Sequence, residues 1–163
     1  MLAATLDYER TLINVSRLAI PTFADWCFVY LALNRQDMSA GLIAHVDAAK
    51  EHLAQQVDIR PEDLSSQTLP VLRVFQTGTP ELFADISDEE LRQTVRHPEK
   101  YEAIKQLGLR SAVVVPIPGR HAVLGVIGFA SAKPSRYTST ELIFAQDLAR
   151  RISLALENAR LYR

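Results

Sequence analysis

Apolar residues change their spacing several times along the chain, and each change marks a predicted element. Across residues 2–19 they recur every three or four positions among charged residues, which predicts an amphipathic helix that ends near Pro21. Two mostly apolar runs follow at 25–33 and 40–47, and the polar stretch NRQD lies between them. Continuous apolar runs of this length predict two strands that form a hairpin and are buried on both faces.

The middle of the chain predicts short helices joined by irregular segments. Two of these helices run from a proline to a glycine, and a third opens on Ser87 and Asp88, either of which can cap it. The predicted helices are 48–57, 69–78, 87–95 and 98–108, with a polar loop at 60–68 and a short extended segment at 80–86. After them, runs typical of strands at 110–117 and 121–132 flank a turn at 118–120.

A long final helix is predicted to begin at a capping box. Thr138 can cap this helix, Glu141 completes the box, and Tyr137 can pack against Leu142 across the first turn. Apolar residues then form two stripes, so two surfaces of the helix need a covering partner. The first stripe has heptad-like spacing and is predicted to be a dimer and signalling seam: Leu142, Ala145, Ala149, Ile152, Leu156 and Ala159. The second stripe is Leu148, Ala155 and Tyr162.

The order of elements predicts the fold class. Strands on both sides of a helical insertion favour one mainly antiparallel sheet, with the terminal helices packed together on one face and the insertion on the other. The predicted class is α+β, in a single domain that spans residues 1–163.

Composition narrows the classes of function. With 163 residues, 48% of them hydrophobic, the chain can bury one full core. The chain has 18 Lys and Arg residues and 19 Asp and Glu residues, so its net charge is −1. It therefore has no net positive charge that would attract nucleic acid. No apolar run is long enough to span a membrane, and the single cysteine, Cys27, fits a cytoplasmic location without disulfides. We expect no nucleic-acid partner and no direct membrane contact.

The glycines between residues 108 and 129 do not fit a phosphate-binding loop. Gly119 and Gly125 enclose five residues rather than four, and Val126 follows instead of Lys-Ser/Thr. A dinucleotide fingerprint would need a helix after Gly128, where the pattern stays strand-like. A hairpin turn at Gly119 and close packing at Gly125 and Gly128 explain these residues better.

The remaining candidate groups form no catalytic constellation. The four histidines lack metal-ligand spacing, and Cys27 lies in an apolar strand, where a thiol is usually a packing residue. The acidic run at 87–90 is more typical of a helix start than of catalytic acids. Arg150 and Arg151 favour a solvated helix face, with interhelical ion pairs as the alternative. We expect no catalytic residue, no metal and no identifiable cofactor in this domain.

Three stretches together resemble a GAF domain. LGLRSAVVVPIPGRHAVLGVIGFAS is similar to the family's pattern of strand, Val-Pro, hairpin and Leu-Gly-Val strand. YTSTELIFAQDLARRISLALENARLYR looks like the closing helix of bacterial GAF modules, and LDYERTLINVSRLAIPTFADWCFVYL is similar to their first helix and strand. The resemblance implies a GAF/PAS-like sheet within a larger signalling protein, namely a sensor histidine kinase, a PP2C-type phosphatase or a cyclic-di-GMP enzyme. Residues 139–163 would then be a signalling helix that leads to a C-terminal output domain.

The chain departs from the subgroups of this family that bind known cofactors. Members that bind cyclic GMP carry an Asn-Lys dipeptide and a Phe with three residues before Asp-Glu, whereas here Phe83 has four residues before Asp88 and no Asn-Lys occurs. Phytochrome-type members attach a bilin through a cysteine beside a histidine, but Phe28 follows Cys27. The methionine sulfoxide reductases of this fold use several cysteines. We therefore expect no cyclic GMP, no covalent bilin and no redox catalysis.

The first functional hypothesis is a bacterial sensory input module that is not itself an enzyme. A small molecule would bind between the sheet and the insertion 69–107 and shift the terminal helices. Strand residues in such a set are more often core positions than ligands. The candidate ligand-binding residues are Tyr30, His45, Phe75, Tyr101, Arg110 and Ser111.

Two alternatives remain open. The domain could be a ligand-free dimerisation and relay scaffold, or the effector domain of a transcription regulator whose DNA-binding module lies elsewhere. In the scaffold, the insertion would fill its own space with Leu72, Phe75, Phe83 and Tyr101. We expect a homodimer that forms through the terminal helices.

Overall fold

The computed structural model describes residues 10, 14, 17, 22–32, 38–57, 70–94 and 98–161. Its strands are β1 (Trp26–Ala32), β2 (Met38–His45), β3 (Glu81–Phe83), β4 (Ser111–Ile117) and β5 (Gly125–Ser131). Its helices are α2 (Ala48–Val57), α3 (Pro70–Thr77), α4 (Asp88–Thr94), α5 (Pro98–Leu107) and α6 (Ser139–Leu161). Residues 10, 14 and 17 are helical, while the rest of the predicted N-terminal helix and the loop 60–68 lie outside the described residues.

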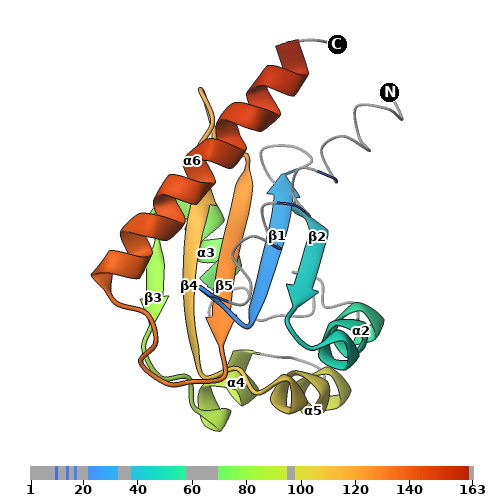
Figure 1. Cartoon of the computed structure of the whole chain (residues 1–163). Helices are drawn as coiled ribbons and strands as arrows, with labels where there is room; N and C mark the ends of the chain where they lie inside the picture. Colours follow the sequence, from blue (N-terminus) through green and yellow to red (C-terminus); the bar gives the residue numbers. More distant parts are fainter. Residues whose placement is uncertain are drawn as a thin grey trace.

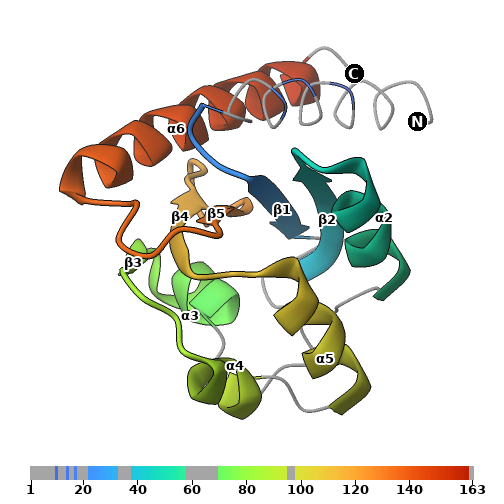
Figure 2. The same ribbon diagram turned by 60° about the horizontal axis from the view of Figure 1, so that its bottom comes forward.

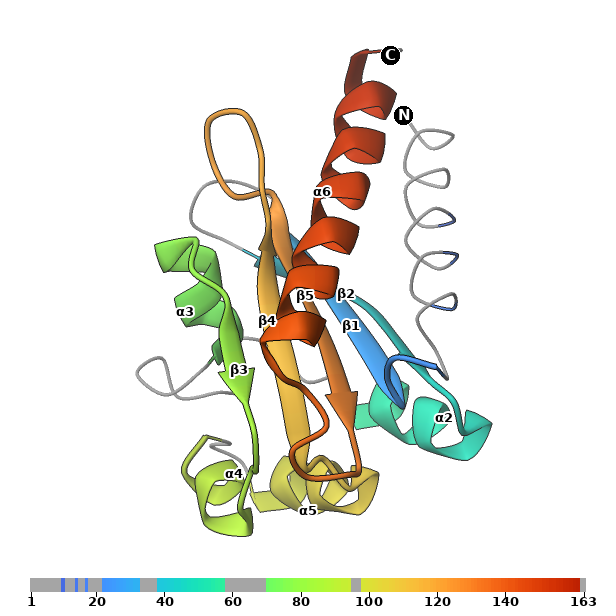
Figure 3. The same ribbon diagram turned by 60° about the vertical axis from the view of Figure 1, so that its left-hand side comes forward.

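The strands form one five-stranded antiparallel sheet in the order β2-β1-β5-β4-β3. Helix α6 crosses one face of this sheet and α3 lies on the opposite face, while α2, α4 and α5 gather at one end (Figure 1, Figure 3). Figure 2 shows the same layers from that end, with α6 on one side of the sheet and α3, α4 and α5 on the other. The predicted α+β class and its antiparallel sheet are confirmed.

Strand residues alternate between two covered faces of the sheet. One set packs with α6: Cys27, Val29, Val113, Val115, Ile117, Ile127 and Phe129. The other set packs with the segments between β2 and β4, and we call this side of the sheet the insertion face. Its residues are Trp26, Phe28, Ala112, Val114, Val126 and Ala130. Because both faces are covered, the apolar runs of β1, β4 and β5 are continuous in the sequence.

The stripe predicted to be a dimer seam packs instead against the sheet of its own chain. Ala145, Ala149, Ile152 and Leu156 are each at most 8% exposed, and they form one cluster with β1, β4 and β5. Leu142 is partly buried against the same cluster, and the side chain of Ala159 lies outside the described residues. Helical spacing identifies an apolar face but not its partner, so the assignment of these residues to a contact between two chains is corrected.

The predicted capping box at the start of α6 is confirmed. Glu141 Oε2 accepts hydrogen bonds from Thr138 N at 2.6 Å and from the Thr138 hydroxyl. Thr138 Oγ1 in turn accepts from Thr140 N at 3.3 Å. Ser87 caps α4 in a similar way, because its Oγ accepts from Glu90 N at 3.2 Å. These bonds satisfy N–H groups that a helix start leaves without partners.

The loop between β4 and β5 is longer than predicted. Residues 121–124, which the pattern assigns to a strand, lie outside β5, and Leu124 N donates to Ile117 O at 2.8 Å to close the loop. Val123 packs beside α3 on one face, and Leu124 packs into the α6 cluster on the other. We define residues 118–124 as the bridging loop.

Candidate functional site

Alternate residues of β1 form a row of aromatic side chains on the face opposite α6. Trp26 packs with residues of α2 and α5, and Phe28 packs with residues of α3. Tyr30 continues the same alternation, and its ring centroid lies 6.0 Å from that of Phe28. Tyr30 therefore lies on the insertion face, where the ligand hypothesis requires it.

His45 lies beside this row at the end of β2. It pairs with Trp26 across the strands, and the two ring centroids are 5.8 Å apart. His45 Nδ1 accepts a hydrogen bond from Asp47 N at 2.8 Å, so the neutral imidazole carries its proton on Nε2. His45 N donates to Glu51 Oε2 at 3.4 Å, and Glu51 Oε1 lies 3.5 Å from Arg17 Nη2. Burial lowers the pKa of His45 below its usual 6.5, and the nearby Lys50 ammonium lowers it further.

The stability of the protein is expected to fall as the pH drops below about 6.5 because of His45. The unfolded chain binds a proton at this residue near its ordinary pKa, whereas the folded chain resists protonation until a lower pH. The contribution of neutral His45 to the free energy of unfolding is therefore complete above pH 6.5. It decreases as the pH falls toward the lowered pKa of the folded state. Urea unfolding from pH 7.5 to 5 measures it.

The His45→Asn variant is the matched test of this pH dependence. An Asn side-chain oxygen can still accept from Asp47 N but does not titrate, so the slope below pH 6.5 should become shallower. His121→Asn, at an exposed residue of the bridging loop, is the control for replacing a histidine outside this site. An unaltered slope in His45→Asn would assign the pH dependence to another group.

Phe28 and Phe75 belong to one apolar cluster on the insertion face. Phe75 of α3 is 8% exposed and belongs to one cluster with Phe28, Val114 and Val126. The ring of Phe28 lies directly over Gly128, where an added Cβ would come within 2.0 Å of Phe28 Cζ. The predicted close packing at this glycine is confirmed, and the contact explains why no side chain occupies the position.

Tyr101 lies farther from the sheet, in a separate cluster. It is buried with Leu91 and Ile104, and the guanidinium of Arg92 lies 5.5 Å from its ring centroid. The Tyr101 hydroxyl is buried and has no hydrogen-bond partner among the described residues. Tyr101 therefore belongs to the contact between α4 and α5 and does not join the aromatic row of β1.

The other two predicted ligand-binding residues also lie apart from that row. Arg110 is exposed, and its Nη2 lies 3.1 Å from Asp85 Oδ1. Ser111 alternates with Val113 and so points to the α6 side of the sheet, where its hydroxyl donates to Lys133 O at 2.6 Å. The placement of Ser111 on the insertion face is therefore corrected. The reason is that successive side chains of a strand point to opposite faces, so an error of one residue places a side chain on the wrong face.

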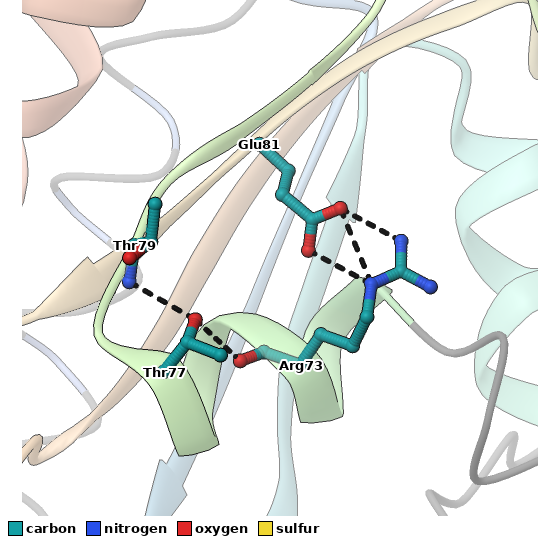
Figure 4. Close-up of polar contacts among 4 residues, drawn as sticks. All are labelled: Arg73, Thr77, Thr79 and Glu81. Carbon is teal, nitrogen blue, oxygen red and sulfur yellow. Dashed lines mark hydrogen bonds and ion pairs between the residues drawn. The ribbon is translucent and has the colours of Figure 1, made fainter.

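An ion pair that the sequence does not indicate fixes α3 to the edge of the sheet (Figure 4). Arg73 of α3 donates to Glu81 of β3, with Nη2 2.7 Å from Oε1 and Nε 3.1 Å from Oε2. The bidentate hydrogen bond raises the pKa of Arg73. Beside it, the Thr77 hydroxyl donates to Arg73 O at 2.8 Å, and Thr79 N donates to Thr77 Oγ1 at 3.2 Å. Neither periodicity nor a motif links residues eight positions apart across a turn, so only the structure reveals the pair.

Cys27 does not fit a covalent chromophore site on the insertion face. Its side chain is fully buried and packs in the α6 cluster, on the opposite face of the sheet. Within the part of the chain that the structure describes, no group of three or more His, Cys, Asp or Glu residues could hold a metal ion. The described helices also include none that is long and apolar enough to cross a membrane.

Comparisons with known proteins agree with this architecture. A family model described as GAF domain matches residues 7–156, and no curated protein matches the chain. The PixJ GAF-domain of Thermosynechococcus elongatus, in its blue-light absorbing form, is similar with a TM-score of 0.71 at 17% identity, over 99% of this chain and 92% of that one. Free methionine-R-sulfoxide reductase from Neisseria meningitidis, in complex with its substrate, gives 0.69 at 17% identity, over 96% and 81%. A domain from Sinorhizobium meliloti 1021 described as a two-component sensor histidine kinase protein gives 0.58 at 15% identity, over 94% of each chain.

Proposed function

The chain belongs to the GAF domain family, and on that premise we propose that it is a sensory input module that binds a small molecule on its insertion face and relays binding to α6. The module would serve a bacterial signalling protein, and we favour a two-component sensor histidine kinase because one structural neighbour is described as such. A role without catalysis is proposed because GAF domains are generally sensory, and because the one cysteine is buried on the α6 side.

The aromatic row of β1 supports binding on the insertion face. Phe28 and Tyr30 place two aromatic rings side by side on this face, with centroids 6.0 Å apart, and aromatic rings favour stacked or edge-on contact with other rings. His45 lies beside the row, and burial lowers its pKa, which favours the neutral imidazole near pH 7. A small molecule with an aromatic or heteroaromatic ring is the proposed ligand class.

The observation that carries the relay proposal is the bridging loop, which contacts both faces of the sheet. Val123 packs beside α3 on the insertion face. On the other face, Arg120 Nε lies 3.1 Å from Glu157 Oε2, and the Ser153 hydroxyl donates to Pro118 O. A displacement of α3 would therefore press on Val123 and move the contacts to α6. Single exposed ion pairs are weak, so their role would be to set the position of the helix rather than to stabilise the fold.

A thermal-shift screen tests ligand binding. Nucleotides, haem, amino acids and small aromatic acids are added to the purified chain, and at least one aromatic class is expected to raise the melting temperature. A ligand at about a hundred times its Kd stabilises the folded state by about 2.7 kcal/mol. Tyr30→Leu, on the insertion face, should reduce this shift, whereas Leu154→Ser, on the outer surface of α6, should not. Failure of every class would remove the sensor proposal.

Hydrogen exchange with and without the ligand found in that screen tests the relay. Binding is expected to change the exchange rates of α6 amides near Ser153 and Glu157. In Arg120→Ala this change should shrink, while Arg151→Ala, which removes an α6 arginine that pairs with Asp147 instead, should keep it. Equal responses in the two variants would contradict a relay through the bridging loop.

The ligand-free scaffold remains the second candidate, because the insertion fills much of its own interior. Phe75 and Tyr101 are each less than 10% exposed and lie in two separate clusters of the insertion. If no compound binds, this packing would be the purpose of the insertion, and the function would lie in the terminal helices.

A further inference from the structure

The turn between β2 and α2 is closed by the side chain of His45. His45 is the last residue of β2 and is 8% exposed, and its Nδ1 accepts a hydrogen bond from Asp47 N at 2.8 Å. Asp47 is also the N-cap of α2, because its Oδ1 accepts from Ala49 N at 2.9 Å and its carbonyl oxygen accepts from Glu51 N at 3.0 Å. The imidazole therefore holds the first residue of the helix against the end of the strand. We name the hydrogen bond from Asp47 N to His45 Nδ1 the clasp.

The clasp exists only while Nδ1 has a free lone pair. A neutral imidazole has one acceptor nitrogen, whereas an imidazolium carries a proton on both nitrogens and accepts no hydrogen bond. After protonation, the Nδ1–H of His45 would point at the N–H of Asp47, and two donors would face each other at 2.8 Å. The ring must then turn away, or Asp47 must move. The observed turn and a protonated His45 therefore exclude each other.

We propose that His45 is a proton-operated switch between β2 and α2: in mildly acidic solution its imidazole takes up a second proton, opens the clasp and frees the start of α2. Histidine is the side chain whose charge ordinarily changes between pH 5 and 8, and protonation of such residues is a known way to shift a packed element. This switch needs no ligand, so it depends neither on the binding proposed for the insertion face nor on the bridging loop.

The groups around His45 set the pH at which the clasp opens. Burial lowers the pKa of His45 most, and the Lys50 ammonium of α2 lowers it further. The carboxylates of Asp25, which precedes β1, and of Asp47 act in the opposite direction and raise it, but less strongly. The second proton therefore binds below the ordinary histidine pKa of about 6.5. Once the ring leaves Asp47 N, the same two carboxylates attract the imidazolium and favour the open clasp.

A change at the start of α2 would reach two further contacts of this helix, which lies at one end of the sheet (Figure 1). Glu51 Oε2 lies 3.4 Å from His45 N, and Glu51 Oε1 lies 3.5 Å from Nη2 of Arg17, a helical residue near the N-terminus. Leu53 packs in the cluster of Trp26. Opening of the clasp would thus alter a contact with the N-terminal segment and the packing over Trp26.

Trp26 provides a direct test, because it is the one tryptophan of the chain and its ring centroid lies 5.8 Å from that of His45. A cation within about 6 Å of an indole ring interacts with it, and an imidazolium quenches indole fluorescence. Between pH 8 and 5, the emission should therefore change in a one-proton transition with a midpoint below about 6.5. Hydrogen exchange, corrected for its intrinsic pH dependence, should become faster at the amides of Asp47, Ala49 and Glu51 over the same range. A wild-type chain without the emission change, or one that keeps these amides protected through it, would overturn the proposal.

Three variants assign the transition to His45. His45→Asn should abolish both changes, because its side-chain oxygen can accept from Asp47 N but does not titrate. His121→Asn should keep both, since the bridging loop precedes β5 while Trp26 pairs with Ala130 near the other end of that strand.

Lys50→Met retains His45 and removes a charge that opposes its protonation, so the midpoint of the emission change should move to higher pH. This variant keeps the test decisive if His45→Asn does not fold, which circular dichroism at pH 7.5 shows. A transition that survives in folded His45→Asn, or a midpoint that does not move in Lys50→Met, would assign the change to another group and overturn the proposal.

Discussion

Replacing Ile152 with alanine is expected to lower the free energy of unfolding by roughly 2–5 kcal/mol, the usual range for such a truncation in a core. Ile152 is 1% exposed and packs in the cluster between α6 and strands β1, β4 and β5. The substitution removes this packing and leaves a cavity that a helix on a sheet can close only in part. Since domains of this size are stable by about 5–15 kcal/mol, the loss is a large share of the total. Chemical denaturation followed by circular dichroism measures it.

Leu154→Ala is the matched control, because it changes the same helix on its exposed side. We expect a change within about 0.5 kcal/mol at dilute protein concentration. If Ile152 lay in a contact between two chains, the loss of stability would depend on protein concentration. The stability of an isolated monomer would then not change. Equal effects at Ile152 and Leu154 would contradict the packing of α6 on its own sheet.

Replacing Gly128 with alanine is expected to destabilise the fold by about 1–3 kcal/mol, as overpacking of a core does. The new Cβ would lie 2.0–2.6 Å from three atoms of the Phe28 ring, which is far inside contact distance. The ring pairs with Gly128 across β1 and β5 and is held from above by the α3 cluster, so it cannot move without disturbing both. The free energy of unfolding and ligand-induced thermal shifts should both decrease.

A double-mutant cycle identifies the cause. In a Phe28→Ala background the ring is absent, so Gly128→Ala should cost much less than it does in the wild-type chain. The coupling between the two changes measures the contact directly. If Gly128→Ala costs the same in both backgrounds, the glycine would be required for the β5 backbone and not for the ring.

Much of the local structure follows from short-range patterns. The helix predicted at 48–57 is the observed α2, and the capping box of Thr138 and Glu141 forms at the start of α6. Helices α3 and α5 each begin with a proline and are each followed by a glycine. These glycines, Gly78 and Gly108, have φ values of 69° and 74°. These features depend on residues within about four positions of each other, and such interactions are visible in a linear sequence.

The candidate site was predictable only in outline. Tyr30, His45 and Phe75 do lie on the insertion face, but Ser111 lies on the other face and Tyr101 in a separate cluster. The predicted ligand-binding set does not include Trp26 and Phe28, although their alternation with Tyr30 along β1 indicates that they share its face. The Arg73–Glu81 pair and the contacts of the bridging loop join distant segments and leave no local signal.

The sequence by itself determined the class of fold, the order of its elements, the helix caps and the close packing at the glycines. Only the tertiary structure decided what each apolar face meets: one stripe of α6 meets the sheet, whereas Ile143 and Leu154 stay exposed. The physical reason is that hydrophobic burial is non-directional, so periodicity shows which side of a helix avoids water but not which surface will cover it. That choice depends on how the whole chain packs.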